Sequence, residues 1–102
     1  MTSGQCYQVS FDAASAAHDT ILITNIDLID INGNIIQTQW IGEIDPKVQM
    51  YTPYFNLNLG IVPVTGYYAF QLTASVDGQT CILNSVVFEG IYNSNSSVTK
   101  CP

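Results

Sequence analysis

The sequence predicts an all-β protein in which residues 1–102 form a single antiparallel β-sandwich. The chain contains 12 Ile, 8 Val and 9 Thr, β-branched types that fit a pleated sheet and lose rotamer freedom in a helix. Apolar and polar residues alternate along Tyr67–Val76, as in a strand with one buried face. About seven short segments of this kind, separated by turn signals and without an amphipathic helix, favour an immunoglobulin-like sandwich, with a jelly roll as the alternative.

The first predicted strands lie on either side of a polar loop. Residues 5–11 alternate and predict a strand, whereas the small and polar residues 12–19 predict a loop. The isoleucine-rich run 20–31 predicts a long strand. Its apolar phase changes near residues 25–27, which indicates a β-bulge or a bend.

A hairpin turn is predicted at Asn32-Gly33-Asn34, because Asn-Gly favours the positive φ angles of tight turns. The returning strand covers residues 35–41. A loop is expected over 42–46, and residues 47–51 form a short strand at best. Residues 54–59 then alternate again and predict a strand with three inward side chains, Phe55, Leu57 and Leu59.

The C-terminal half predicts one long hairpin after a connection over residues 60–66. Its strands cover 67–76 and 79–89, and the two residues between them, Asp77-Gly78, are a strong hairpin signal. Counting outward from this turn pairs residues that share an apolar face: Ala74 with Cys81, Leu72 with Leu83, and Tyr68 with Val87. The termini, residues 1–4 and 93–102, are expected to be flexible.

Charge and targeting signals narrow the class of protein. Two lysines stand against eight acidic residues, giving a net charge of -6. This balance excludes a basic patch for nucleic acid and disfavours anionic membranes. No segment has the pattern of a signal peptide or a transmembrane helix. If Met1 is the natural start, an extracellular type of domain without a signal predicts a virion protein, with an extracellular or cell-surface location as the alternative.

The three cysteines have no C-x-x-C spacing, so a zinc site has little support. A disulfide can join Cys81 to Cys101, or Cys6 to Cys101, in an oxidising compartment. Because Cys81 lies on the apolar face of a predicted strand, it is expected to be buried. At least one free, buried thiol is the preferred state.

Two overlapping motifs resemble known families. The segment 63–70 (PVTGYYAF) resembles the P-x-x-G-x-Y-x-F segment of C1q/TNF-like jelly rolls, and 9–13 is similar to their opening strand. The segment 66–81 is similar to the G-x-Y…D-x-x-G-C pattern of PKD-like and other immunoglobulin-like surface modules. The short chain after Val76 favours the second resemblance. Both families imply non-enzymatic roles in recognition or assembly, and small immunoglobulin-like modules recur as decoration proteins on phage capsids and tails.

Candidate catalytic and metal-binding groups have simpler interpretations. His18 is the only histidine, and an exposed loop residue is the preferred interpretation over a Cys–His nucleophile pair. Asp30–Asn34 begins like a calcium loop, but its glycine is one position early and Ile41 stands where the bidentate Glu would be. A hairpin turn explains the same residues. We therefore predict no enzyme activity, no cofactor and no metal.

Two surfaces remain as candidates for binding. Tyr67 is predicted to share a face of the hairpin with Val86 and Phe88, and an apolar patch outside a sandwich predicts an interface. The preferred function is therefore a structural subunit of a virion or extracellular assembly, a capsid decoration, head–tail or fibre component. It would contact itself or other structural subunits, as a homo-oligomer or docked on a larger assembly. The alternative is a surface adhesin or carbohydrate-binding module that uses Trp40, Glu43, Asp45 and Tyr51.

Overall fold

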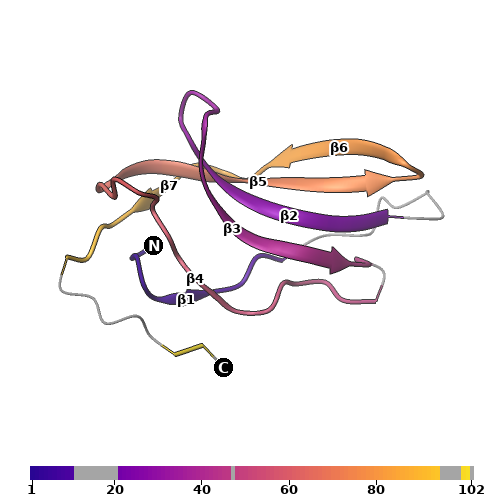
Figure 1. Ribbon diagram of the computed structural model, residues 1–102, viewed down its shortest axis with the longest axis horizontal. Helices are drawn as coiled ribbons and strands as arrows, with labels where there is room; N and C mark the ends of the chain where they lie inside the picture. The colour runs from indigo at the N-terminus through magenta and orange to yellow at the C-terminus, as the bar shows by residue number, and fades with distance from the viewer. Residues whose placement is uncertain (11–20, 47, 95–99, 102) are drawn as a thin grey trace.

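The computed structural model describes residues 1–10, 21–46, 48–94, 100 and 101. All regular elements among these residues are strands, and the all-β class is confirmed. Figure 1 shows them as a long curved sheet with a smaller layer below it. The strands are β1 (Cys6–Tyr7), β2 (Ile21–Asp30), β3 (Ile35–Ile44), β4 (Phe55–Asn56), β5 (Gly66–Val76), β6 (Gln79–Asn84) and β7 (Phe88–Gly90).

The larger sheet has the order β3-β2-β5-β6, and β7 also pairs with β5. All of these pairings are antiparallel. β7 pairs with Gly66–Tyr68 and β6 with Gln71–Val76, so the two short strands follow one another along the same edge of β5 (Figure 1). This edge therefore consists of a β6 half and a β7 half.

The second layer is built from the N-terminal segment and residues 51–59. β1 pairs with β4, and beyond them Thr52 donates its N–H to the carbonyl of Val9 at 2.9 Å. The Thr52 hydroxyl accepts the N–H of Val9 at 3.1 Å, which satisfies the polar group of a side chain that is fully buried. The two antiparallel layers pack into a single β-sandwich, as predicted.

The main core lies between these layers. It joins Ile26 and Leu28 of β2, Tyr68 and Phe70 of β5, and a set from the second layer, Phe55, Leu57 and Leu59. The rings of Phe55 and Phe70 meet edge to face at 6.0 Å. The inward orientation predicted for the second-layer residues is confirmed. Each buried side chain of this size contributes about 1.5–3 kcal/mol to stability.

The predicted hairpin turn at Asp77-Gly78 is also confirmed. Asp77 has φ 49° and Gly78 has φ 82°, and two positive angles in succession define a type I′ turn. The register near the turn is the predicted one, with Ala74 opposite Cys81 and Leu72 opposite Leu83.

Farther from the turn the predicted register is wrong, because Tyr68 lies opposite Phe88 and not Val87. The shift follows Ser85, whose N–H donates to the carbonyl of Phe70 and whose hydroxyl accepts the N–H of the same residue. One extra residue is accommodated between β6 and β7. A one-residue shift moves every following side chain to the other face.

The first hairpin and the segment that follows it confirm one prediction and differ from two. The register shift between Ile23 and Asn25 confirms the predicted bulge. β3 extends to Ile44, so the loop predicted over 42–46 is wrong at its start. Ile44 is buried because it packs on Ile23 and Ala74 in a second core cluster. The predicted strand over 47–51 is reduced to an isolated bridge between Ser10 and Tyr51, with residue 47 outside the described residues.

The N-terminal strand is shorter than predicted: β1 covers two residues of the 5–11 segment, and Phe11 lies outside the described residues. Residues 1–4, predicted to be flexible, are hydrogen-bonded to the strand edge instead. Ser3 donates its N–H to the carbonyl of Ile91 at 2.9 Å, and Ile91 donates to the carbonyl of Met1 at 2.7 Å. This segment covers the β7 half of the edge and connects the two layers.

Candidate interaction surfaces

The described residues contain no group of three or more His, Cys, Asp or Glu side chains that could hold a metal ion. His18, the only predicted candidate for a catalytic base, lies outside the described residues. In the part of the chain that the structure describes, no helix is long and apolar enough to cross a membrane.

The Asp30–Asn34 segment forms the turn between β2 and β3. One Asp30 carboxylate oxygen accepts the backbone N–H groups of Asn32 at 2.9 Å and Asn34 at 3.0 Å, and the other accepts the Asn34 side-chain amide at 3.3 Å. The backbone hydrogen bond from Asn34 is the main reason why the pKa of Asp30 is lowered. The carboxylate stabilises its own turn, in agreement with the hairpin interpretation.

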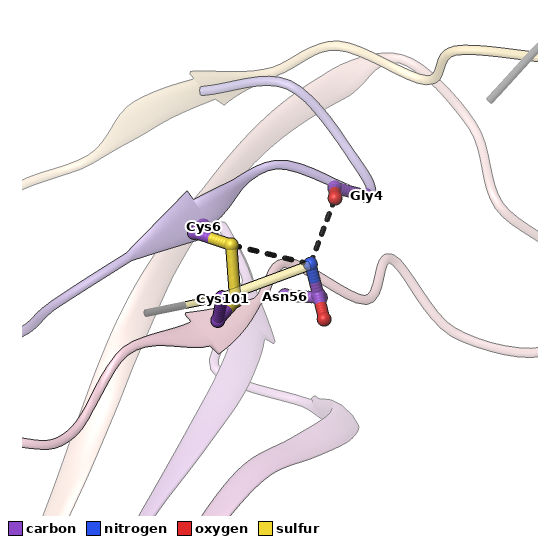
Figure 2. The surroundings of a disulfide bond; sticks show 4 residues. All are labelled: Gly4, Cys6, Asn56 and Cys101. Carbon is purple, nitrogen blue, oxygen red and sulfur yellow. Dashed lines mark hydrogen bonds between the residues drawn. A yellow bond between two sulfur atoms is a disulfide. The ribbon is translucent and has the colours of Figure 1, made fainter. Parts of the chain in front are cut away.

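A disulfide joins Cys6 to Cys101, with their Cα atoms 5.6 Å apart. Figure 2 shows Cys6 on β1 and the side chain of Asn56, from the neighbouring strand β4, pointing toward it. The Asn56 amide donates to the carbonyl of Gly4 at 2.9 Å and to the Cys6 sulfur at 3.6 Å. The bond attaches the end of the C-terminal segment, predicted to be flexible over 93–102, to the second layer. Residues 95–99 and 102 of that segment lie outside the described residues.

The disulfide between Cys81 and Cys101 is therefore contradicted, and Cys81 is a free and exposed thiol. Its predicted burial is wrong although its predicted face is right, because it lies opposite Ala74 on the inner side of the hairpin. No described residue of the second layer covers it. Alternation identified the face, but the extent of the opposing layer decides what that face buries.

The predicted glycan-binding residues are divided between core and surface. Trp40 is half-buried and packs against both core clusters. A Cβ atom added to Gly42 would come within 2.5 Å of the Trp40 ring, so the ring lies directly over that backbone. Glu43, Asp45 and Tyr51 are exposed. Since Trp40 is not an open aromatic platform, this placement weighs against the carbohydrate-binding hypothesis.

The predicted interface residues are also separated. Tyr67 is 62% exposed on the outer face, and Val86 is 85% exposed in the irregular segment between β6 and β7. The prediction for Phe88 is wrong: its side chain faces inward beside Tyr68, and its ring lies 4.9 Å from that of Phe70. The extra residue at the end of β6 turns Phe88 into the core. Its predicted place beside Tyr67 is therefore wrong.

An open cavity of about 330 Å³ lies where the N-terminal segment meets residues 56–60. Two of its polar side chains have partners within the chain. The side-chain oxygen of Asn58 accepts the N–H of Gly60 at 2.9 Å, and the Ser3 hydroxyl accepts the N–H of Asn93 at 2.9 Å.

The outer face of the large sheet carries a polar cluster that alternation alone did not reveal. Asp27 is 5% exposed and accepts hydrogen bonds from Thr38 at 2.6 Å and from the side chain of Asn25 at 2.8 Å. The cluster satisfies a buried carboxylate within the sheet. The Asp residues in the isoleucine-rich run were its only sequence signal.

Strand β6 is the most unusual surface of the described residues. All six of its residues are exposed, including Ile82 at 56% on the outer face and Leu83 at 64% on the inner face. Figure 1 shows its free side at the upper edge of the sheet, away from the second layer. Among the described residues no strand pairs with this side of β6, and apolar side chains are exposed on both of its faces. Sequence reasoning missed it because Cys81 and Leu83 were expected in the core.

Comparison of the chain with protein-family models, with characterised proteins and with solved structures finds no match.

Proposed function

We propose that the chain is a structural, non-enzymatic subunit of an extracellular or virion assembly and acts by protein–protein contact. The observation that carries the proposal is the open β6 half of the edge, with exposed Cys81, Ile82 and Leu83. A monomeric domain normally protects a free strand edge with charge, proline or a covering segment. An edge without such protection is best explained by a partner strand.

Two further features support this proposal. The Cys6–Cys101 disulfide favours an oxidising location, such as the cell exterior or a particle surface. Only 10% of the residues are charged, and interfaces between subunits are depleted of charge at their centre. A capsid decoration, head–tail or fibre component of immunoglobulin-like type combines both features.

The test is to sediment the particles and filaments released by the producing organism and to quantify the chain by mass spectrometry. We expect the chain to sediment with a large assembly, at a fixed ratio to another of its components, after washing in high salt. Recovery of the chain only as a free, slowly sedimenting protein would overturn the proposal. If that free protein also bound a glycan array, the adhesin or carbohydrate-binding alternative would replace it.

A further inference from the structure

We infer that β6 pairs with β6 of a second copy of the chain, antiparallel and across a twofold axis at Ile82. The two five-stranded sheets would then form one continuous sheet. The inference rests on the proposed function, since it names the partner of the surface that carries it. Three features of the sheet support it: the other edges are protected, alternate backbone groups of β6 face the open edge, and the strand carries no charge.

The other edges of the large sheet are protected. β3 has three register shifts against β2, and such bulges twist an edge away from new partners. The Gln39 side chain on β3 also donates to the carbonyl of Asn58 at 2.7 Å and accepts its N–H at 2.9 Å. Residues 1–3 cover the β7 half of the other edge. The β3 edge and the β7 half of the other edge are therefore both protected against pairing with another strand.

The β6 half has none of these devices. Its pairing with β5 runs from Gln71–Asn84 to Val76–Gln79 without a register shift. Its sequence, QTCILN, contains neither a charged residue nor a proline. The strand is regular and uncharged, with apolar side chains at Ile82 on the outer face and at Cys81 and Leu83 on the inner face, which are properties of an edge that accepts another strand.

The type I′ turn determines which backbone groups of β6 are free. This turn closes on a hydrogen-bonded pair, Val76 with Gln79, and hydrogen-bonded pairs then alternate along an antiparallel ladder. The odd-numbered residues of β6 therefore direct their N–H and C=O groups toward β5. The even-numbered residues direct theirs to the open edge, and these are Thr80, Ile82 and Asn84.

A twofold axis perpendicular to the sheet keeps each face on the same side. It must therefore lie between the two strands, midway between a residue and the same residue of the partner. Centred on Ile82, it pairs Ile82 with the partner's Ile82 and Thr80 with the partner's Asn84. All free groups of the three even-numbered residues are then satisfied, by about six hydrogen bonds. On the inner face, Cys81 lies opposite the partner's Leu83, so apolar residues face each other.

The self-complementary register and the absence of charge on β6 fit a second copy as the occupant. Two chains that each carry a net charge of -6 repel one another, but β6 brings only uncharged side chains to the axis. A strand of six residues forms a small interface, below the roughly 800 Å² per partner of a standard complex. We therefore expect a weak dimer, with a dissociation constant on the order of micromolar.

The first experiment is light scattering of the whole chain from about 1 µM to about 1 mM, with the disulfide intact. Wild type should pass from monomer to dimer over this range. Ile82→Lys places two like charges opposite each other at the axis and should weaken the dimer by about 100-fold. The matched control is Ile61→Lys, which adds the same charge at a 95% exposed isoleucine near the opposite end of β5.

The second experiment tests the register by mild oxidation and peptide mapping. Leu83→Cys places a thiol opposite the partner's Cys81 in the close, non-hydrogen-bonded arrangement, so a covalent dimer should form through these two positions. Ile61→Cys is the matched control and should stay monomeric on a denaturing gel. Wild type should form little covalent dimer, because Cys81 faces the partner's Leu83.

Each contrary result overturns the inference. A wild-type monomer across the whole range excludes a second copy on β6, and an undiminished dimer of Ile82→Lys places the contact elsewhere. Efficient Cys81–Cys81 cross-linking in wild type moves the axis to Cys81 and contradicts the Ile82 register. A monomer that still sediments with a large assembly would reject this inference but keep the proposed function, because a different protein would then supply the strand.

Discussion

The two halves of the hairpin follow the same alternating pattern, but the strands that pair with β5 in each half, β7 and β6, have different surroundings. In the first half, Tyr68 and Phe70 are 5% and 3% exposed, because the second layer covers them and Phe88 packs beside them. In the second half, the hairpin partner β6 exposes Cys81 and Leu83 on the same inner face. We call these the closed half and the open half of the hairpin.

The difference shows that alternation identifies a face and says nothing about what covers it. The closed half is covered because residues 51–59 and the N-terminal segment end beneath it. No described residue of the second layer extends beneath β6. We therefore expect the closed half to hold the stability of the domain and the open half to tolerate substitution in the isolated chain.

The largest effect is expected for core truncation in the closed half. Phe70→Ala removes a ring that contacts both Phe55 and Phe88, and it should lower the free energy of unfolding by about 3–5 kcal/mol. Leu83→Ala, the matched change in the open half, should cost less than about 1 kcal/mol. Urea unfolding at a concentration that keeps the chain monomeric measures both. Equal losses would show that the open half is packed in solution.

The next largest effect concerns the disulfide of the second layer, which covers the closed half. The Cys6–Cys101 bond spans 95 residues of sequence, and replacing Cys101 by Ser should lower stability by about 2–5 kcal/mol. Cys81→Ser controls for the loss of a thiol and should change stability by less than about 0.5 kcal/mol. Urea unfolding with and without reductant compares the variants. A wild type that is unaffected by reduction would contradict the stabilising role of this bond.

Two glycines extend the comparison to the backbone. A Cβ atom at Gly90 would lie 2.7 Å from the ring of Tyr68, whose hydroxyl is held by the carbonyl of Val64 at 2.6 Å. Because this ring cannot move away freely, Gly90→Ala should cost about 1–3 kcal/mol. At Gly78 a Cβ atom meets nothing within 4 Å, and Gly78→Ala should cost only about 1 kcal/mol for its φ of +82°. Thermal unfolding should rank them in this order; the reverse order would indicate that the turn matters more than the packing.

The smallest effect is expected at the other hairpin turn, where Asp30 lies opposite Tyr68 at the edge of the closed half. The pKa of Asp30 is lowered mainly by the N–H of Asn34, so the carboxylate stabilises the turn above its unfolded pKa. This contribution is lost as the pH falls through the folded pKa, which is below 3.8. The amide resonances of Asn32 and Asn34 should report this titration by NMR. It should vanish in Asp30→Asn and persist in Asp45→Asn; a midpoint at or above 3.8 would contradict the proposed hydrogen bonds.

Much of the fold could be predicted because its signals are local. The type I′ turn follows from Asp77-Gly78, and the bulge in β2 follows from the phase change of its isoleucines. The inward residues of the second layer were correct for the same reason, since period 2 depends only on the pleat of one strand. These predictions needed no knowledge of distant contacts.

The failures all depend on residues far apart in the sequence. The predicted face of Phe88 was wrong because the strand holds one extra residue after Ser85, which is hydrogen-bonded to the backbone of Phe70. The pairing of Cys101 was left open between two cysteines, and only the position of β1 beside β4 brings Cys6 within reach. Of the predicted surface candidates, Tyr67 and Val86 are exposed, whereas Trp40 is half-buried and packs against the core.

The sequence by itself determined the class of this protein: β-branched composition, alternation and turn residues act over a few positions and leave only an antiparallel sheet. It also determined the low fraction of charged residues, 10%, on which the proposed contact between copies relies. The tertiary structure decided where the second layer ends, which cysteines meet, and which edge stays open. Those outcomes depend on the lengths and registers of segments that meet only after folding, so no local pattern could specify them.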